Sequence, residues 1–273
     1  MGVLNVTPDS FYDGGRYATF EKALRHAERM VEEGADYVDV GGESTRPGAE
    51  GVSEAEELDR VVAVVEAIRQ RFDVALSVDT SRPAIILAAC AAGATLVNDV
   101  RALAEDGALA AALEAEADIG LMHMLGKPRT MQVNPEYADV VADVAAFLDA
   151  RAQQCLAAGV RPEQLLIDPG IGFGKTLTHN LELLQALPRL TNSGFGVLLG
   201  VSRKSMFGQL LGAPAERRLY ASLAVAIQAA NAGVAMLRVH DVAATVESLA
   251  VWSAIAAPER AAASIGAPVK LGA

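Results

Sequence analysis

One stretch indicates the architecture of this chain, Leu165-Leu166-Ile167-Asp168-Pro169-Gly170-Ile171-Gly172-Phe173-Gly174-Lys175. An apolar run typical of a buried parallel strand leads directly into Asp168, a proline and three glycines that alternate with larger residues. Glycines permit positive φ and close backbone approach, so this loop can surround a flat or phosphorylated ligand while Asp168 points into it. An isolated Asp-Pro-Gly is more often a simple turn, but several other strand ends in this chain look the same.

The pattern of an apolar run followed by polar residues occurs eight times. Predicted strands lie at 2–6, 37–40, 74–78, 94–97, 119–124, 165–168, 196–201 and 235–239. Eight helical patterns alternate with them, near 20–34, 53–71, 83–92, 107–115, 135–158, 180–187, 215–232 and 241–255. Thr19 is the expected cap of the first helix, and Ser53 with Glu56 forms a capping box for the second.

This alternation predicts parallel strands with right-handed crossovers, which close most economically as a single-domain α/β protein, a (β/α)8 TIM barrel. The length of 273 residues suits that fold. We expect the barrel to span residues 1–257 and a loosely packed tail to span 258–273. An open doubly wound sheet is the alternative, but no Gly-x-Gly-x-x-Gly follows the first predicted strand.

Composition excludes several functional classes. Apolar residues make up 52% of the chain, yet no run reaches the length of a membrane span and no signal sequence begins it, so we expect a cytoplasmic location. The net charge of -11 argues against nucleic acid or an anionic membrane as a partner. Cys90 and Cys155 lie in alanine-rich helical patterns without ligand-like spacing, which indicates reduced, structural thiols.

The charge pattern is uneven along the chain. Much of the acid falls on predicted helices, whereas basic residues follow predicted strands. The basic residues in question are Arg46, Arg101, Lys127, Arg129, Lys175, Arg203, Lys204 and Arg238. Basic loops on an acidic body suggest a small anionic substrate.

In a closed barrel the carboxyl ends of all strands meet at one face. The polar residues at these ends are Asn5, Asp39 with Thr45 and Arg46, Asp79, Asn98, Met122 with His123, Asp168, Lys204, and Arg238 with His240. Asp79, Asn98 and Asp168 suit a heterocycle that carries amino and ring N–H groups. Arg238 and His240, with Asn5 opposite, suit a diphosphate and Mg2+. The first two loops have the composition of a lid over a second substrate, although ordinary surface loops remain the simpler interpretation.

Eight ordered motifs resemble dihydropteroate synthase, and the resemblance covers nearly the whole chain. They are residues 5–11 with 13–15, 42–48, 78–80, 98–99, 122–124, 168–175, 202–205 and 238–241. The resemblance implies a transferase of folate biosynthesis that condenses 6-hydroxymethyl-7,8-dihydropterin diphosphate with 4-aminobenzoate, giving 7,8-dihydropteroate and pyrophosphate. It also implies a homodimer, a requirement for Mg2+, and inhibition by sulfonamides.

The resemblance assigns roles by position. The pterin is given to Asp79, Asn98, Met122, Asp168, Phe173 and Lys204, and the diphosphate to Asn5, Arg238 and His240, with Asn5 also as the metal ligand. The aminobenzoate is given to Phe11, Thr45, Arg46, Pro47, Phe173, Lys204 and Ser205. The residues expected to carry catalysis are Asp79, Asp168, Lys204, Arg238 and His240, through electrostatic positioning more than through acid–base work.

Two departures from the family pattern stand out. The first strand begins at once, without the short segment that usually precedes it, and we expect this to affect stability rather than chemistry. Ile171 stands where the family often has an aromatic residue. Three other functions are compatible with parts of the pattern: a methyltetrahydrofolate-binding methyltransferase on the same barrel, a Schiff-base aldolase using Lys204, and a pterin-binding protein without turnover.

Overall fold

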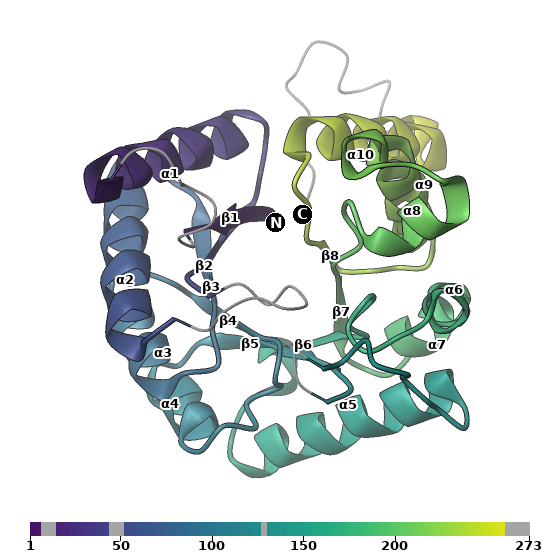
Figure 1. Ribbon diagram of the computed structural model, residues 1–273, viewed down its shortest axis with the longest axis horizontal. Coiled ribbons are helices and arrows are strands. Elements are labelled where there is room, and N and C mark those ends of the chain that lie inside the picture. Colours follow the sequence, from purple (N-terminus) through teal and green to yellow (C-terminus); the bar gives the residue numbers. More distant parts are fainter. Residues whose placement is uncertain (7–14, 44–51, 127–129, 260–273) are drawn as a thin grey trace.

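The strands form a closed parallel barrel (Figure 1). The computed structural model describes residues 1–6, 15–43, 52–126 and 130–259, and for residues 15–19 it describes the backbone only. The strands follow one another in chain order: β1 (Gly2–Asn5), β2 (Tyr37–Gly41), β3 (Ala75–Asp79), β4 (Leu96–Asp99), β5 (Asp118–Met122), β6 (Leu165–Asp168), β7 (Gly196–Leu199) and β8 (Met236–Leu237). A parallel bridge between Gly2 and Val239 joins the last strand to the first, with Val3 N donating to Val239 O at 3.0 Å. The predicted (β/α)8 fold is confirmed.

The helices surround the strands on the outside (Figure 1). They are α1 (Gly15–Glu32), α2 (Glu54–Arg71), α3 (Pro83–Ala91), α4 (Ala108–Glu114), α5 (Val140–Ala157), α6 (Leu177–Gln185), α7 (Leu187–Thr191), α8 (Ser205–Leu211), α9 (Leu219–Asn231) and α10 (Val242–Ala256). Ten helices within the described ranges replace the eight predicted. Pro188 lacks an N–H and sits in the first turn of α7, which separates α7 from α6, and Gly212 with φ +62° ends the additional helix α8.

The predicted starts of α1, α5, α6 and α9 differ from the structure by three or more residues, whereas the predicted capping box of α2 is confirmed. α1 begins at Gly15, so Thr19 lies inside the helix and not at its cap. α5 begins at Val140 and not near Pro135, because the side chain of Asp139 accepts hydrogen bonds from the first free N–H groups of the helix. The capping box of Ser53 and Glu56 is present at the start of α2.

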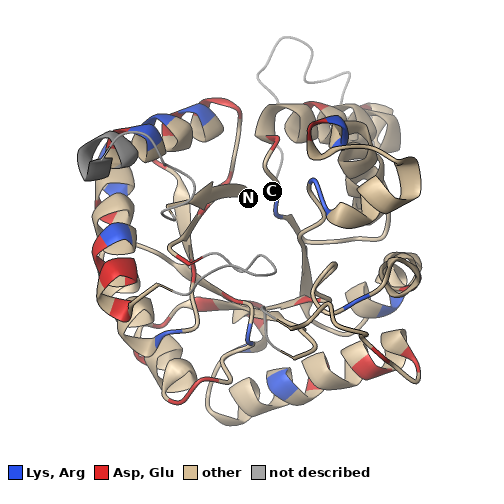
Figure 2. Ribbon diagram, viewed as in Figure 1, with Lys and Arg blue, Asp and Glu red and all other residues tan. Residues whose placement is uncertain are grey.

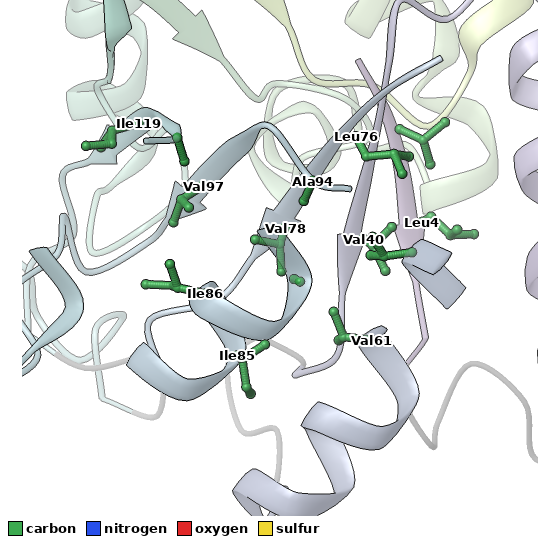
Figure 3. Packing of buried hydrophobic residues seen from close by; sticks show 14 of the residues in the cluster. Leu4, Val40, Val61, Leu76, Val78, Ile85, Ile86, Ala94, Val97 and Ile119 are labelled. Carbon is green, nitrogen blue, oxygen red and sulfur yellow. The ribbon is translucent and has the colours of Figure 1, made fainter. Parts of the chain in front are cut away.

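The main core lies between the strands and the helices. Outward side chains of β2 to β4, such as Val40 and Val78, pack with Val61 of α2 and with Ile85 and Ile86 of α3 (Figure 3). Each of these five side chains is fully buried, and a side chain of this size contributes about 1.5 to 3 kcal/mol when it is buried. The helices are therefore held to the barrel by a continuous apolar layer.

The barrel interior has an apolar layer below a polar one. Met1, Leu96 and Leu198 form a small cluster inside the ring. Because side chains alternate between the two faces of a strand, Asn98 follows Leu96 on the inner face of β4, two residues nearer the carboxyl end. Its register partner on β3 is Asp79, so polar side chains of neighbouring strands share one level.

Charged residues of both signs occur on the outer helices, whereas the charged residues within the strands are all acidic (Figure 2). Lys127 and Arg129 lie outside the described residues, as do residues 260–273 of the expected tail. The boundary at residue 257 therefore stays a prediction. Within the described part of the chain, no helix combines the length and the apolar character that crossing a membrane requires.

Candidate active site

Asp168, the last residue of β6, lies in the candidate site. Its register partner on β5 is Met122, and the two side chains are both buried. Oδ1 of Asp168 accepts a hydrogen bond from Gly170 N at 2.7 Å, which turns the chain into the glycine loop, residues 169–174. Burial raises the pKa of Asp168, whereas the Gly170 N–H and the ammonium of Lys204 lower it. The carboxylate is therefore held in a dry, cationic environment.

The glycine loop is fastened from several sides. Gly172 N donates to Asn180 Oδ1 at 2.7 Å, and the hydroxyl of Tyr137 donates to Gly174 O at 2.8 Å. Gly170, Gly172 and Gly174 all have positive φ, at +66°, +83° and +67°. Glycine is the residue that adopts this conformation at least cost, so the alternating glycines of the sequence are explained by the backbone path.

Lys175 ends the loop and is almost completely buried. Its Nζ lies 2.9 Å from His123 Nδ1 and donates to Phe173 O at 3.0 Å and to His123 O at 3.4 Å. Burial, and to a smaller extent Lys204, lower the pKa of Lys175 to about 7, against the opposing effect of Asp168. Three acceptors around one ammonium match its three N–H groups, so Lys175 ties the end of β5 to the glycine loop.

Phe173 projects from the loop beside Lys204. The Nζ of Lys204 lies 4.3 Å from the centre of the Phe173 ring, a cation–π contact. Lys204 comes from the turn between β7 and α8, and burial lowers its pKa to about 8 while Asp168 opposes that effect. A cation and an aromatic face thus lie together beside Asp168, which suits a flat polar ring.

Arg238, directly after β8, lies between two buried carboxylates. Its Nε donates to Asp39 Oδ2 at 2.6 Å and its Nη2 donates to Asp79 Oδ2 at 2.8 Å. Asn98 Nδ2 donates to the same Asp39 oxygen at 3.1 Å. Burial raises the pKa of Asp79 to about 7, and the attraction of Arg238 opposes this rise. Side chains from β2, β3, β4 and the end of β8 therefore form one hydrogen-bonded group.

His240 lies at the start of the segment that leads into α10. Its ring Nδ1 and its backbone N both lie 3.1 Å from Ser202 Oγ. Since that oxygen accepts from the backbone N–H, its own proton can be donated to Nδ1, which leaves the ring proton on Nε2. Burial and the neighbouring Arg238 lower the pKa of His240 to about 4, so the imidazole is neutral at pH 7.

A second group of polar side chains, around the buried Glu57, lies beside the end of β3. Glu57 of α2 accepts from Thr80 Oγ1 at 2.8 Å and lies 3.1 Å from Arg82 Nη1. The other nitrogen, Nη2, donates to Val52 O at 2.7 Å and lies 3.8 Å from Glu43 Oε1. Arg82 therefore contacts the last residue described before segment 44–51 and the first residue after it.

The predicted site residues fall into three groups. Asp79, Asn98, Met122, Asp168, Phe173, Lys204 and Arg238 lie together at the barrel mouth. Asn5, His240 and Ser205 lie at strand or helix ends nearby, but within the described chain they make no hydrogen bond to that group. Phe11, Thr45, Arg46 and Pro47 lie outside the described residues.

Two residues of the site were given no binding or catalytic role from the sequence, although Asp39 was expected at this face of the barrel. Asp39 is an acid in the apolar strand Tyr37–Gly41, and an acid at a fully buried position is a usable signal because it requires a partner. The sequence predicts Lys175 only as one of the basic residues that follow strands, because its sequence context does not distinguish a buried lysine from an exposed one. Together with Asp79, Asp168, Lys204 and Arg238 they give three acids and three bases.

Comparison with known proteins agrees with this geometry. Residues 1–240 match the model of a protein family described as pterin binding enzyme. A dihydropteroate synthase from Haemophilus influenzae is 52% identical over 256 residues, which is 94% of this chain and 93% of that protein. The chain belongs to the dihydropteroate synthase family of pterin binding enzymes.

Solved structures of the dihydropteroate synthase family share the fold. The Yersinia pestis enzyme with a sulfonamide drug has a TM-score of 0.89 and 52% identity, and the match covers 94% of each chain. The Burkholderia cenocepacia enzyme complexed with 7,8-dihydropteroate has a TM-score of 0.85 and 47% identity, over 96% of this chain and 92% of that one. The similarity to the dihydropteroate synthase family therefore extends from the amino-acid sequence to the path of the backbone.

Proposed function

We propose that this chain condenses 6-hydroxymethyl-7,8-dihydropterin diphosphate with 4-aminobenzoate to 7,8-dihydropteroate and pyrophosphate, a transferase step of folate biosynthesis. The observation that carries the proposal is the group of inward acids and bases at the strand ends, in a chain 52% identical to a dihydropteroate synthase. A relative bound to 7,8-dihydropteroate supports the same product here.

The pterin is proposed to lie between the strand-end acids and Phe173. Asp79, Asn98 and Asp168 offer acceptors for amino and ring N–H groups, and buried acceptors make such recognition selective because an unmatched ligand leaves them unpaired. Lys204 supplies a donor beside the Phe173 ring. Met122 supplies an apolar wall next to Asp168.

The diphosphate is proposed to lie against Arg238 and His240. Nε and Nη2 of Arg238 are bound to carboxylates, which leaves Nη1 without a hydrogen bond to the described residues and able to donate to a phosphate oxygen. The Nε2–H of neutral His240 is a second donor. Both groups stabilise negative charge as it builds up on the departing pyrophosphate.

A divalent ion fits this arrangement. The described residues contain no group of three or more His, Cys, Asp or Glu able to hold a metal. Asn5 Oδ1 and Asp79 Oδ2 lie 3.5 and 3.6 Å from the point where a Gly41 Cβ would be, so two oxygens face the space that this glycine leaves. Mg2+ typically takes one or two protein oxygens together with phosphate oxygens. We propose that Asn5 holds Mg2+, which when bound neutralises charge on the diphosphate.

The chemistry follows from positioning. The C–O bond between the pterin methylene and the diphosphate breaks, and the electron pair leaves with pyrophosphate toward Arg238 and His240. The electron-poor methylene is captured by the amine of 4-aminobenzoate, which then loses a proton. Asp168 balances positive charge on the ring during this step. Preorganised charges in a site without water are the main source of the rate enhancement, and each correctly placed donor raises kcat roughly 10²- to 10³-fold.

The aminobenzoate is proposed to enter beside Phe173 and Lys204, near exposed Ser205 at the start of α8. Phe11, Thr45, Arg46 and Pro47 are proposed as its other contacts. Sulfonamides resemble 4-aminobenzoate, and a relative has been solved with such a drug. We therefore expect sulfonamides to compete with the amine. An initial rate that does not change at a sulfonamide concentration well above that of the amine contradicts this expectation.

We also propose a homodimer that assembles through the face of α8 to α10, in the cytoplasm. These three helices carry exposed large apolar side chains: Leu210 and Leu211 of α8, Tyr220 of α9, and Val251 and Ile255 of α10. α9 and α10 pack against each other, and α8 lies beside them (Figure 1). Apolar patches of this kind typically mark protein interfaces. A monomeric mass in solution contradicts the proposal.

The function is tested by measuring pyrophosphate release from dihydropterin diphosphate and Mg2+, with and without 4-aminobenzoate, while mass spectrometry detects dihydropteroate. We expect amine-dependent product that is lost in Asp168→Asn and in Lys204→Met. Pterin binding without turnover refutes the synthase and supports a pterin-binding protein. A substrate carbonyl trapped on Lys204 by borohydride indicates an aldolase instead.

A further inference from the structure

Asp39 is an acid at the centre of β2 with no solvent exposure. It lies in register with Val3 of β1 and with Ser77 of β3, below the level at which Asp79 and Asn98 pair. A buried carboxylate requires compensation by donors or cations. The identity of its partners therefore defines its role.

Both partners of Asp39 are residues of the proposed substrate site. Its Oδ2 accepts from Arg238 Nε at 2.6 Å and from Asn98 Nδ2 at 3.1 Å. The other oxygen, Oδ1, is buried and makes no hydrogen bond within the described residues. Asp39 makes no side-chain bond to a turn or helix cap there, so its polar contacts do not serve local backbone structure.

The contact with Asp39 determines which way the Asn98 amide faces. Because Nδ2 donates to the carboxylate, the amide oxygen is turned toward β5, where a Cβ at Gly120 would lie 3.3 Å from it. An asparagine presents a donor on one side and an acceptor on the other. Asp39 thus presents the acceptor of Asn98 to a ligand and holds its donor away.

The same carboxylate fixes the guanidinium of Arg238. With Nε bound to Asp39 and Nη2 bound to Asp79, the planar group is held at two points, and the N–H groups of Nη1 and the second N–H of Nη2 are left for an anion. If Asp39 loses its charge, Asp79 becomes the only carboxylate bound to Arg238. The guanidinium can then turn about that contact.

We propose that Asp39 is a positioning residue that fixes the Asn98 amide and the Arg238 guanidinium together. It thereby links recognition of the pterin ring to recognition of the diphosphate. The inference rests on the proposed function, because it assigns Asn98 to the ring and Arg238 to the diphosphate.

Asp39→Asn tests this role because the two side chains have nearly the same shape. We expect kcat/KM for the pterin diphosphate to fall roughly 10- to 100-fold, by analogy with the loss of residues that orient the ligands of a metal site. The Kd of 6-hydroxymethyl-7,8-dihydropterin, measured by calorimetry without the amine, should rise at least several-fold because a neutral amide oxygen holds Asn98 and Arg238 less firmly than a carboxylate.

Asp99→Asn is the matched control. Asp99 is also an acid with no solvent exposure, but it accepts from Leu103 N at 2.8 Å and from the Ser81 hydroxyl, outside the substrate group. We expect this variant to be less stable than the wild type while its KM and pterin Kd stay within about three-fold. If both variants lose pterin affinity and kcat/KM equally, Asp39 has only a structural role and the proposal is wrong.

A measurement on the wild-type protein keeps the test valid if Asp39→Asn does not fold. The Nε–H of Arg238, observed by 15N NMR, should exchange slowly with solvent because it is bound to Asp39 at 2.6 Å. Fast exchange at neutral pH overturns the proposal. If the wild type binds pterin without turnover and Asp39→Asn weakens that binding, the proposed function fails while the positioning role stands.

Discussion

Replacing Gly170 by alanine should separate the glycine loop from β5. A Cβ at this position would lie 1.9 Å from the carbonyl oxygen of His123, whereas real Cβ atoms are essentially never found closer than 3.0 Å to another heavy atom. The gap must therefore widen by about 1.1 Å. The obstacle is backbone at the end of β5, so no side-chain rotation relieves the contact, and the loop itself must move.

The magnitude follows from that displacement. The loop carries Phe173, which contacts Lys204, and misplacing a binding group by about 1 Å can reduce activity roughly 10²-fold. We expect kcat/KM for the pterin substrate to fall about 100-fold, which corresponds to about 2.7 kcal/mol of transition-state stabilisation. Steady-state pyrophosphate release measures this value, and urea unfolding measures the accompanying loss of stability.

Gly212→Ala is the matched control. Gly212 has φ +62°, close to the +66° of Gly170, but nothing lies within 4 Å of its Cβ position. This substitution should cost only the roughly 1 to 2 kcal/mol of left-handed strain, with kcat/KM unchanged. If the two variants have kcat/KM values within about three-fold of each other, the glycine loop does not depend on close approach to His123 and the reasoning is refuted.

Three further outcomes are expected. The kcat/KM of the wild type should fall as pH rises through about 8, where Lys204 loses its proton. Between about pH 8 and the ordinary lysine pKa of 10.5 the unfolded chain binds more protons than the folded protein, so Lys204 should make the free energy of unfolding rise with pH over this range. If urea titrations of the wild type and of Lys204→Met give the same dependence of that free energy on pH, this expectation is contradicted. Lys175→Met removes the donor to Phe173 O and should raise the pterin Kd roughly ten-fold by calorimetry, and an unchanged Kd shows that the lysine does not position the loop. Arg82→Ala leaves Glu57 buried beside Thr80 alone and should lower the free energy of unfolding by about 3 kcal/mol, whereas a loss below about 1 kcal/mol in urea shows that Glu57 is solvated.

Local patterns were sufficient for the strands and for several helix ends. The Ser53 and Glu56 capping box is confirmed because its hydrogen bonds form within four residues. Thr19 was wrongly predicted as a cap, since α1 extends back to Gly15. Short helices such as α8 were missed because seven residues give little periodic signal.

The site residues were predictable wherever a strand end exposes a polar side chain. Asp79, Asn98 and Asp168 follow directly from the alternation of apolar runs and acids or amides, because the closed barrel brings all carboxyl ends of its strands to one face. Asp39 was predicted at a strand end without a role, whereas the structure extends β2 to Gly41 and so places Asp39 inside the strand. Its function depends on Arg238, a partner 199 residues away in the sequence.

The sequence by itself determined the number and order of the strands and the family, because periodicity and ordered motifs are local properties of the chain. Only the tertiary structure decided which charges pair. Closure of the barrel between Gly2 and Val239 brings β8 beside β1, so that Arg238 reaches both Asp39 and Asp79. Contacts between distant residues depend on strand register and ring closure, and neither is encoded in any short segment.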